Sequence, residues 1–393
     1  MADKSKISYV DATWNPITGC SVESPGCKNC YAMKLAGTRL KHHPSRAGLT
    51  VDTKNGPVWT GEVRLNPEWL DQPIRWRRQR QIFVCAHGDL FHPAVPDDWI
   101  DLVFGVMWAC LYGKNGEDGH IFMVLTKRSA RMREYMSQDR RQQWADAAVA
   151  YGGGSDPDGL HDQIMGFDGP HPRIMMGVTV EDQARADLRL PDLDATPAAL
   201  RWVSVEPMLG PVKLRLAECL NGCGYVTPEP ANNGKDLACP HCKSLVTRCG
   251  AGNRHGGLLG KRQIDLVIVG GESIVGSDKD NDARPMHPHW VRDLRDECEE
   301  AGVEWNFKQW GQWLPWLEFQ RAGVEDDTEQ TRFRTVIWQD RWVDCGYPIW
   351  CDMRDNYGGG AESPQDPDQI MGSVGKKASG RLFDGKTYDS FPV

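Results

Sequence analysis

The sequence predicts an α/β protein built on a complete or partial βα barrel. Short apolar, β-branched runs recur along the chain and are typical of buried strands. Helical patterns lie between several of these runs, and such alternation favours a parallel sheet with crossover helices. About eight strands are expected, which is enough for most or all of a barrel. The chain of 393 residues, 40% hydrophobic and 25% charged, has the composition of a globular protein with a sizeable core.

The expected elements follow one another as far as Phe307. The first helix is expected at Ala32–Leu40, and the last ends before Gly302, a residue suited to a helix C-cap. The other expected helices are Asp97–Leu111, Arg128–Met136 and His289–Ala301. The expected strands are Ile7–Val10, Val63–Leu65, Ile82–Cys85, Ile121–Leu125, Ile174–Val180, Trp202–Val205, Leu266–Val269 and Val303–Phe307.

Several segments interrupt this alternation. Tyr151–Pro172 is rich in Gly, Asp and Pro and is predicted to be a long loop. After Trp316 the alternation stops, and Phe333–Trp350 is typical of a β-hairpin-like appendage. We therefore divide the chain into the first part of the barrel (1–211), an inserted segment (212–262), the last barrel units (263–316) and a C-terminal appendage and tail (317–393).

Three cysteines near the start of the chain are spaced for metal chemistry. Cys20, Cys27 and Cys30 form a C-x6-C-x2-C pattern in the loop 19–31, after the first expected strand. Three neighbouring thiolates suit an iron–sulfur cluster in which one iron has no protein ligand. Such an iron could chelate S-adenosylmethionine and deliver an electron to it, at the barrel mouth where barrel chemistry resides. The alternative is a zinc knuckle completed by a distant ligand such as His42 or His43.

Four further cysteines predict a zinc ribbon in the inserted segment. Four thiolates saturate a tetrahedral zinc ion, so this site should be structural. Free thiols or a second iron–sulfur cluster are the alternatives. The chain has 13 cysteines and no signal peptide, so we expect a cytoplasmic protein whose cysteines are ligands or free thiols. The predicted zinc ligands are Cys219, Cys223, Cys239 and Cys242.

The net charge of the chain limits the classes of partner that it is expected to bind. A net charge of −8 argues against a protein that coats nucleic acid, and no apolar run has the length of a membrane span. Two local basic runs, Arg75–Arg80 and Lys127–Arg133, could bind phosphates or could be solvated helix faces.

Polar residues at the carboxyl ends of the expected strands should line the barrel mouth. Carboxylates there could bind the ribose hydroxyls or the ammonium of a cofactor through charge-assisted hydrogen bonds. Arg284 could pair with a substrate carboxylate or phosphate. Each of these residues could also be an ordinary strand-end polar group or helix cap. The candidate cofactor-binding residues are Thr179, Glu181, Glu206, Glu272 and Lys308, and the candidate substrate-binding residues are Asp89, His92, Lys127 and Arg284.

Motifs spread along the chain carry a family resemblance. The run DATWNPITGCSVESPGCKNCYA resembles the opening of a phage-associated family that is similar to radical SAM proteins. The resemblance covers nearly the whole chain apart from the insertion. Radical SAM enzymes usually show C-x3-C-x2-C, so the first spacing here is three residues longer. The other matching segments are CAHGDLFHPAVPDDWI, IFMVLTKRSARM, GVTVEDQARADLRLPDL, RWVSVEPMLGPV, VIVGGES, ARPMHPHWVRDLRDEC, FKQWG and GRLFDGKTYDSFP.

This resemblance implies a barrel of the radical SAM type, with a 4Fe-4S cluster on Cys20, Cys27 and Cys30 as its catalytic centre. Gly177–Glu181 is similar to a strand that packs near the adenine of S-adenosylmethionine, and Gly270–Glu272 is similar to the family's ammonium-binding Gly-Gly-Glu. The implied reaction is the modification or rearrangement of a nucleobase, as in hypermodification of thymine in phage DNA. Its partners would be DNA or a nucleotide, and an electron donor such as flavodoxin or ferredoxin, in the host cytoplasm.

Two other functions are compatible with the same residues. The chain could be a non-catalytic DNA-binding protein in which both cysteine groups hold zinc. It could also be a metal-dependent hydrolase that uses carboxylates and histidines such as His87, Asp89 and His92.

Overall fold

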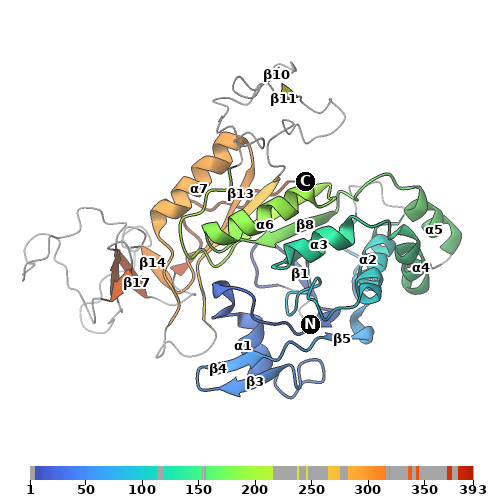
Figure 1. The fold of residues 1–393 in the computed structure, drawn as a ribbon, viewed down its shortest axis with the longest axis horizontal. Helices are drawn as coiled ribbons and strands as arrows, with labels where there is room; N and C mark the ends of the chain where they lie inside the picture. Colours follow the sequence, from blue (N-terminus) through green and yellow to red (C-terminus); the bar gives the residue numbers. More distant parts are fainter. Residues whose placement is uncertain are drawn as a thin grey trace, which may run out of the picture.

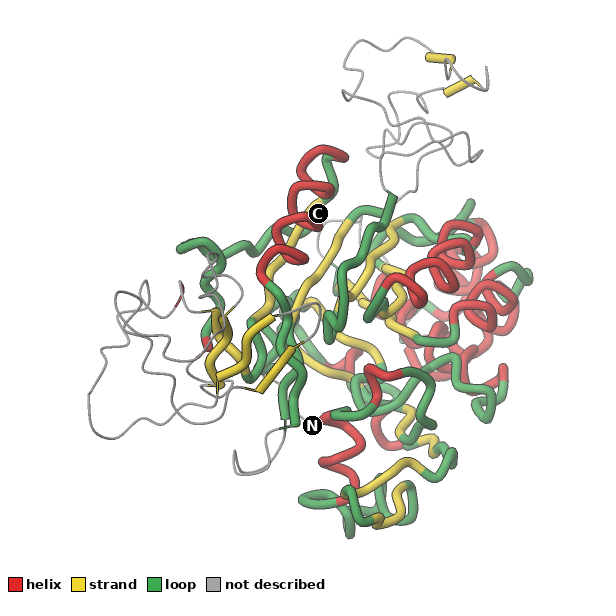
Figure 2. The backbone as a smooth tube through the Cα atoms, turned by 60° about the vertical axis from the view of Figure 1, so that its left-hand side comes forward, coloured by secondary structure: helices red, strands yellow, loops and turns green. Residues whose placement is uncertain are grey.

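A curled parallel sheet forms the centre of the molecule in a computed structural model (Figure 2). The model describes residues 5–112, 119–152, 154, 156–215, 237–238, 245–246, 264–274, 282–315, 318, 335–338, 342–344, 370–373 and 379–392. Seven strands pair in the order β1-β6-β7-β8-β9-β12-β13, each parallel to its neighbour. They are β1 (Ala12–Trp14), β6 (Gln81–Val84), β7 (Ile121–Thr126), β8 (Ile174–Thr179), β9 (Leu200–Val205), β12 (Leu266–Gly270) and β13 (Glu304–Gln309).

The order of the strands confirms the α/β class and a partial barrel. Each strand of the sheet pairs with the next one along the chain, which is the winding of a βα barrel. Among the described residues, β1 and β13 are the two ends of the sheet and do not pair with each other. The sheet is therefore a half-barrel, and the alternative of a complete barrel is wrong for this part of the chain.

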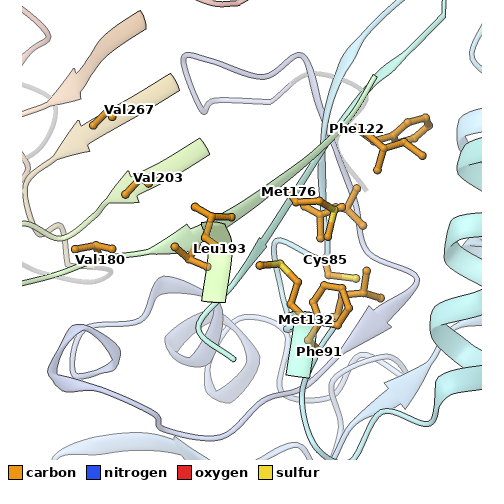
Figure 3. Close-up of a cluster of buried hydrophobic side chains, with 14 of the residues drawn as sticks. Cys85, Phe91, Phe122, Met132, Met176, Val180, Leu193, Val203 and Val267 are labelled. Atoms are coloured by element: carbon orange, nitrogen blue, oxygen red, sulfur yellow. The ribbon is translucent and has the colours of Figure 1, made fainter. Parts of the chain in front are cut away.

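Helices cover the convex face of this sheet (Figure 1). Four of them are α2 (Asp97–Leu111), α3 (Ser129–Met136), α6 (Gln183–Ala195) and α7 (Pro288–Ala301). Alternate side chains of the strands point toward these helices, because side chains alternate between the two faces of a strand. Figure 3 shows Phe122, Met176 and Val203 of three strands near Met132 of α3 and Leu193 of α6. Burial of this apolar layer is what attaches the helices to the sheet.

A second apolar cluster fills the concave face of the half-barrel. It includes Met123, Met175 and Ile268, and the Trp202 indole lies at its centre without exposure to solvent. Trp202 Nε1 donates to the Val124 carbonyl oxygen at 3.1 Å. A Cβ atom at Gly177 would lie 2.4 Å from Trp202 Nε1, so only glycine leaves room for the indole there.

The first expected strand was placed wrongly. Ile7–Val10 lies in turns, and β1 begins at Ala12. Tyr9 and Val10 are apolar because they cover the concave cluster, not because they pair in the sheet. The Val63–Leu65 expectation is also wrong for the barrel, since β5 (Arg64–Leu65) pairs antiparallel with β2 (Ile17–Thr18) outside the main sheet.

The predicted long loop at Tyr151–Pro172 is wrong because it contains a helix. The end of α4 (Arg141–Gly152) enters this segment, and α5 spans Pro157–Gly166. Asp156 caps α5 by accepting a hydrogen bond from the Gly159 backbone N–H at 3.1 Å. The Asp and Pro residues that suggested a loop are therefore helix-start signals.

The remaining helices near the sheet agree more closely with expectation. The bounds of α2 are those predicted, and α7 ends at Ala301 with Gly302 as its C-cap, in a left-handed backbone conformation with φ of 68°. The helix after the cysteine loop is shorter than expected, since α1 covers Tyr31–Gly37. It packs beside the hairpin of β3 (Thr50–Thr53) and β4 (Gly56–Trp59).

The inserted segment lies between two strands that are neighbours in the sheet, β9 and β12. Within it, β10 (Leu237–Ala238) pairs antiparallel with β11 (Leu245–Val246). The predicted zinc ligands Cys219, Cys223, Cys239 and Cys242 lie outside the described residues. In the described part of the chain, no helix has the length and apolar character needed to cross a membrane.

Beyond the half-barrel, four short strands form an antiparallel sheet in the order β14-β17-β15-β16. The expected hairpin at Phe333–Trp350 corresponds to β15 and β16, which pair antiparallel. These strands are β14 (Trp313–Pro315), β15 (Thr335–Trp338), β16 (Trp342–Asp344) and β17 (Ile370–Ser373).

Residues 379–392, which we call the closing segment, return to the half-barrel. The Phe307 backbone N–H of β13 donates to the Tyr388 carbonyl oxygen at 3.1 Å. Phe383 is fully buried, and Asp384 pairs with Arg292 of α7 at 2.9 Å. This segment therefore covers the outer edge of the sheet beside β13.

Candidate functional site

The cysteine loop 19–31 lies against the carboxyl ends of several strands of the half-barrel. At its start, Gly19 forms a parallel β-bridge with Gly88, in the segment that follows β6. Its middle forms a short 3-10 helix at Pro25–Cys27, and α1 begins directly after Cys30. The contacts described below connect this loop to the ends of β7, β8 and β12, which is the mouth of the half-barrel.

The three thiols of the loop lie close enough for their charges to interact. Cys27 is buried, and Cys20 and Cys30 are half-buried. Burial raises the pKa of the Cys20 thiol to about 12, and the Asp89 carboxylate adds to this rise while Arg128 opposes it. Burial also raises the pKa of Cys30. Metal ligation requires thiolates, so metal binding here would release protons at neutral pH.

The three cysteines have the chemistry of iron–sulfur ligands. In a cluster each thiolate binds a different iron atom, so the sulfurs need not converge on one point. Cys20, Cys27 and Cys30 are soft donors from one loop, and they would hold such a cluster.

Glu181 is the carboxylate that connects the cysteine loop to the sheet. It follows β8, has no exposed surface, and pairs with both Lys127 and Arg189. Ser24 donates a hydrogen bond to the same carboxylate, and a Cβ at Gly26 would lie 2.6 Å from its Oε1 atom. Burial opposes ionisation, but the two cations outweigh it and lower the pKa of Glu181.

Asp89 organises the other side of the loop. It accepts hydrogen bonds from Thr126 Oγ1 at 2.7 Å and from the Lys127 backbone N–H at 3.1 Å, and it pairs with Arg128 at 3.0 Å. Arg128 Nη1 also lies 3.4 Å from the Cys20 sulfur. The predicted substrate residue Asp89 is thus occupied by protein partners next to a cysteine.

A half-buried ion pair lies at the end of β9. Lys308 Nζ is 2.8 Å from Glu206 Oε1, and the ammonium lies 5.4 Å from the centre of the Tyr9 ring. Tyr9 and Ser204 both donate hydrogen bonds to Glu206 Oε2, at 3.3 and 3.2 Å. The structure therefore brings together two candidate cofactor residues, Glu206 and Lys308.

A third carboxylate follows β12. Glu272 is 4% exposed and accepts hydrogen bonds from the Arg284 backbone N–H at 2.7 Å and from Arg284 Nε at 2.9 Å. Arg284 Nη2 also donates to the Pro25 carbonyl oxygen at 2.9 Å. Arg284, which the sequence suggested for substrate binding, therefore joins Glu272 to the cysteine loop.

The remaining candidates have local partners. Thr179 is buried, and its carbonyl oxygen accepts a hydrogen bond from Arg189 at 2.7 Å. His92 Nε2 is 2.8 Å from Ser21 Oγ, and its Nδ1 accepts a hydrogen bond from the Ala94 backbone N–H. Burial lowers the pKa of His92, so the imidazole is neutral at neutral pH.

The residues of the hydrolase alternative, His87, Asp89 and His92, each have other partners in the protein. His87 packs edge-on against the Tyr31 ring, and burial lowers its pKa to about 4. The Asp89 carboxylate is engaged by Arg128, and His92 by Ser21. These three side chains do not form a common set of metal ligands among the described residues.

The four cations of the second basic run pair with carboxylates of the same chain. Lys127 pairs with Glu181 and Arg128 with Asp89, as described above. Arg131 lies 2.8 Å from Asp97, and Arg133 lies 2.9 Å from Asp192. In the first run, Arg75 pairs with Asp71 and Arg80 stacks over Trp76.

Sequence reasoning missed several residues of the site. Arg189 of α6 is only 2% exposed and pairs with Glu181. Ser21 and Ser24 lie in the cysteine loop and contact the charged side chains of Arg128 and Glu181. A signal for Arg189 exists, because it follows Ala186 by three residues and precedes Leu193 by four, so it lies on the apolar stripe of its helix. A charge on such a stripe indicates a buried partner.

A separate cavity of about 270 Å³ lies on the helical side of the sheet. Its walls include Trp108, Trp144, Phe167 and His171, from α2, α4 and the segment after α5. None of the cysteines or strand-end carboxylates described above lines it.

Comparison with known proteins matches the chain to a family model. The model of a family described as "Protein of unknown function (DUF5131)" matches residues 4–392. No curated protein and no solved structure matches significantly.

Proposed function

Since the chain belongs to the DUF5131 family of proteins of unknown function, we propose from its site that it is an iron–sulfur enzyme of the radical SAM type. The observation that carries this proposal is the position of Cys20, Cys27 and Cys30 at the mouth of a half-barrel. One loop supplies three soft donors there, which is the number that leaves one iron of a 4Fe-4S cluster without a protein ligand.

The surroundings of the thiols suit an anionic group. Arg128 lies beside Cys20, and Lys127 is near enough to Cys30 to oppose the rise in its pKa. Both cations follow β7, and each is fixed by a buried carboxylate. Thiolate clusters carry negative charge, which these cations would offset in a site with little solvent.

Two half-buried ion pairs at the mouth suit a zwitterionic cofactor. Glu206 with Lys308 and Glu272 with Arg284 each present a carboxylate beside a cation. The methionyl part of S-adenosylmethionine carries an ammonium and a carboxylate, so it could exchange partners with such a pair. When bound, the cluster would supply the electron that cleaves this cofactor.

For the substrate we propose a nucleobase, with thymine in phage DNA as the specific case. This part of the proposal rests on the resemblance to a phage-associated family. A base in duplex DNA must leave the stack to reach a recessed barrel mouth, so single-stranded or flipped bases are the expected substrates.

Anaerobic purification tests the cluster. We expect a brown protein that contains iron and acid-labile sulfide, and we expect Cys27→Ala to lose both. Cys298→Ala is the matched control, because Cys298 is fully buried in α7 on the helical side of the sheet. A colourless wild-type protein that contains only zinc would contradict the proposal and favour a zinc-containing binding protein.

A second experiment tests the reaction. The reconstituted protein is incubated with dithionite, S-adenosylmethionine and single-stranded thymine-containing DNA. We expect release of 5′-deoxyadenosine and a changed thymidine mass after digestion of the DNA. Release without a change in the DNA would support radical SAM chemistry and reject this substrate.

A further inference from the structure

Arg128 is a buried cation in direct contact with a cysteine of the proposed cluster site. It is 8% exposed, and its Nη1 atom lies 3.4 Å from the Cys20 sulfur. It comes from the end of β7, whereas Cys20 lies in the cysteine loop, so the contact joins two separate parts of the half-barrel mouth. Such a contact between a guanidinium and a cluster ligand has an electrostatic consequence.

The guanidinium of Arg128 is held in place by other groups. Nη1 lies 3.0 Å from Asp89 Oδ2, and Nη2 donates to both the carbonyl oxygen and Oγ of Ser21 at 2.9 Å. Asp89 is itself fixed by Thr126 Oγ1 at 2.7 Å and by the Phe91 backbone N–H at 3.0 Å. Arg128 therefore cannot turn away from Cys20 without breaking several charge-assisted hydrogen bonds.

A fixed donor at a ligand sulfur affects the two oxidation states of a cluster unequally. Reduction adds one electron, and the reduced cluster is the more negative state. A hydrogen bond or positive charge at a cysteine sulfur stabilises that state more than the oxidised state, and so raises the reduction potential. The low exposure of Arg128 strengthens the effect, because little solvent screens it.

We propose that Arg128 is a positioning residue that sets the reduction potential of the cluster bound by Cys20, Cys27 and Cys30. This inference rests on the proposed function. Asp89 has the opposite effect, because its carboxylate partly neutralises the guanidinium. With both charges present, the reduction potential of the cluster should lie below the value with Arg128 alone and above the value with Asp89 alone.

The test is a redox titration of the full-length, anaerobically reconstituted protein with dithionite, followed by electron paramagnetic resonance. In Arg128→Met the ratio of reduced to oxidised cluster at a fixed ambient potential should fall about tenfold, since a hydrogen bond to a charged group is lost. A tenfold change equals about 59 mV for a one-electron couple. In Asp89→Asn the ratio should rise.

The opposite directions distinguish electrostatic control from a purely structural role. Both variants break the same ion pair, so a role limited to support of the loop predicts shifts of the same sign, or none. Arg131→Met is the matched control, because Arg131 belongs to the same basic run but lies in α3 and pairs with Asp97 of α2. This variant should leave the potential unchanged.

The remaining outcomes distinguish failure of this inference from failure of the proposed function. If Arg128→Met does not fold, Arg128→Lys keeps the charge but loses the fork of donors, and it should lower the ratio by a smaller factor. An unchanged potential in the folded variant overturns this inference alone. Wild-type protein that binds no iron and sulfide overturns the proposed function instead.

Discussion

A single carboxylate, that of Glu181, connects three segments that are distant in the sequence. It contacts Ser24 of the cysteine loop, Lys127 after β7 and Arg189 of α6. Glu181→Gln keeps the shape but leaves two cations without their charge partner. We expect a loss of about 3–5 kcal/mol in the free energy of unfolding, measured by urea denaturation.

A surface pair supplies the control for this prediction. Glu299 is 65% exposed at its side chain and lies 3.9 Å from Arg295. Glu299→Gln should change the free energy of unfolding by less than about 1 kcal/mol, because solvent screens an exposed pair. Equal losses in the two variants would show that Glu181 has no special structural role.

His171 gives the protein a pH-dependent stability in mildly acidic solution. Burial, together with Arg173, lowers its pKa from 6.5 to about 4. The unfolded chain therefore binds a proton that the folded chain excludes, so stability falls as pH drops from about 6.5 to about 4. For this residue the loss is up to about 3 kcal/mol.

The variant His171→Asn isolates this contribution. Asparagine retains an acceptor for the Arg173 backbone N–H, which donates to His171 Nδ1 at 3.1 Å, but it does not titrate. Urea denaturation between pH 7 and 4 should show a shallower decline in the variant. Parallel curves for the two proteins would contradict the prediction.

The sequence identifies the acidic half of the site more readily than the basic half. Glu181 and Glu206 directly follow apolar runs, and Glu272 follows one after two glycines, so their place at the sheet edge can be predicted. Arg128 looks like part of an exposed basic run, because its partner Asp89 lies 39 residues away. Long-range pairs of this kind become visible only when the fold brings the two chain segments together.

At the scale of elements, the closing segment packs against the edge of the sheet, a role that could not be predicted from the sequence. Phe383 is fully buried, with its ring centre 5.1 Å from that of Phe307 and 5.5 Å from that of Trp310. Phe383→Ala should cost about 3–5 kcal/mol in the free energy of unfolding, because it leaves a cavity at the sheet edge. Thermal and urea unfolding measure this loss.

The neighbouring residue provides a matched control. Leu382 is 39% exposed, so Leu382→Ala removes little buried surface and should change stability by less than about 1 kcal/mol. If both variants behave alike, the closing segment does not support the half-barrel.

The elements that were predicted wrongly share a cause. Ile7–Val10 has the composition of a strand, but its apolar side chains cover the concave cluster. Pro157–Gly166 has the composition of a loop, but Asp156 and Pro157 start a helix. Apolar pattern shows that a segment is buried, whereas the pairing partner of that segment depends on the rest of the chain.

At the scale of the molecule, the half-barrel tolerates a long insertion because β9 and β12 are neighbours in the sheet. We predict that residues 216–263 can be replaced by a flexible Gly/Ser linker of about ten residues without loss of the fold. Metal analysis should then show loss of zinc, which we predict on Cys219, Cys223, Cys239 and Cys242, while iron is retained. Wild-type protein without zinc would contradict the ribbon prediction.

The winding of the half-barrel could be predicted, but its closure could not. Alternating strands and helices favour the parallel order that the seven strands adopt. Whether a barrel closes depends on the pairing of its first and last strands. Here the closing segment contacts β13, with Asn306 bridged to Asp389, and no sequence period signals such a contact.

The buried indole of Trp202 suggests that a small molecule could replace this side chain in a cavity variant. Trp202→Gly should cost about 3–5 kcal/mol and leave a void shaped like indole, with the Val124 carbonyl oxygen as an acceptor in its wall. Added indole should then raise the melting temperature of the variant but not that of the wild type. N-methylindole, which lacks the N–H donor, should restore less, so the stability of this protein could be placed under chemical control.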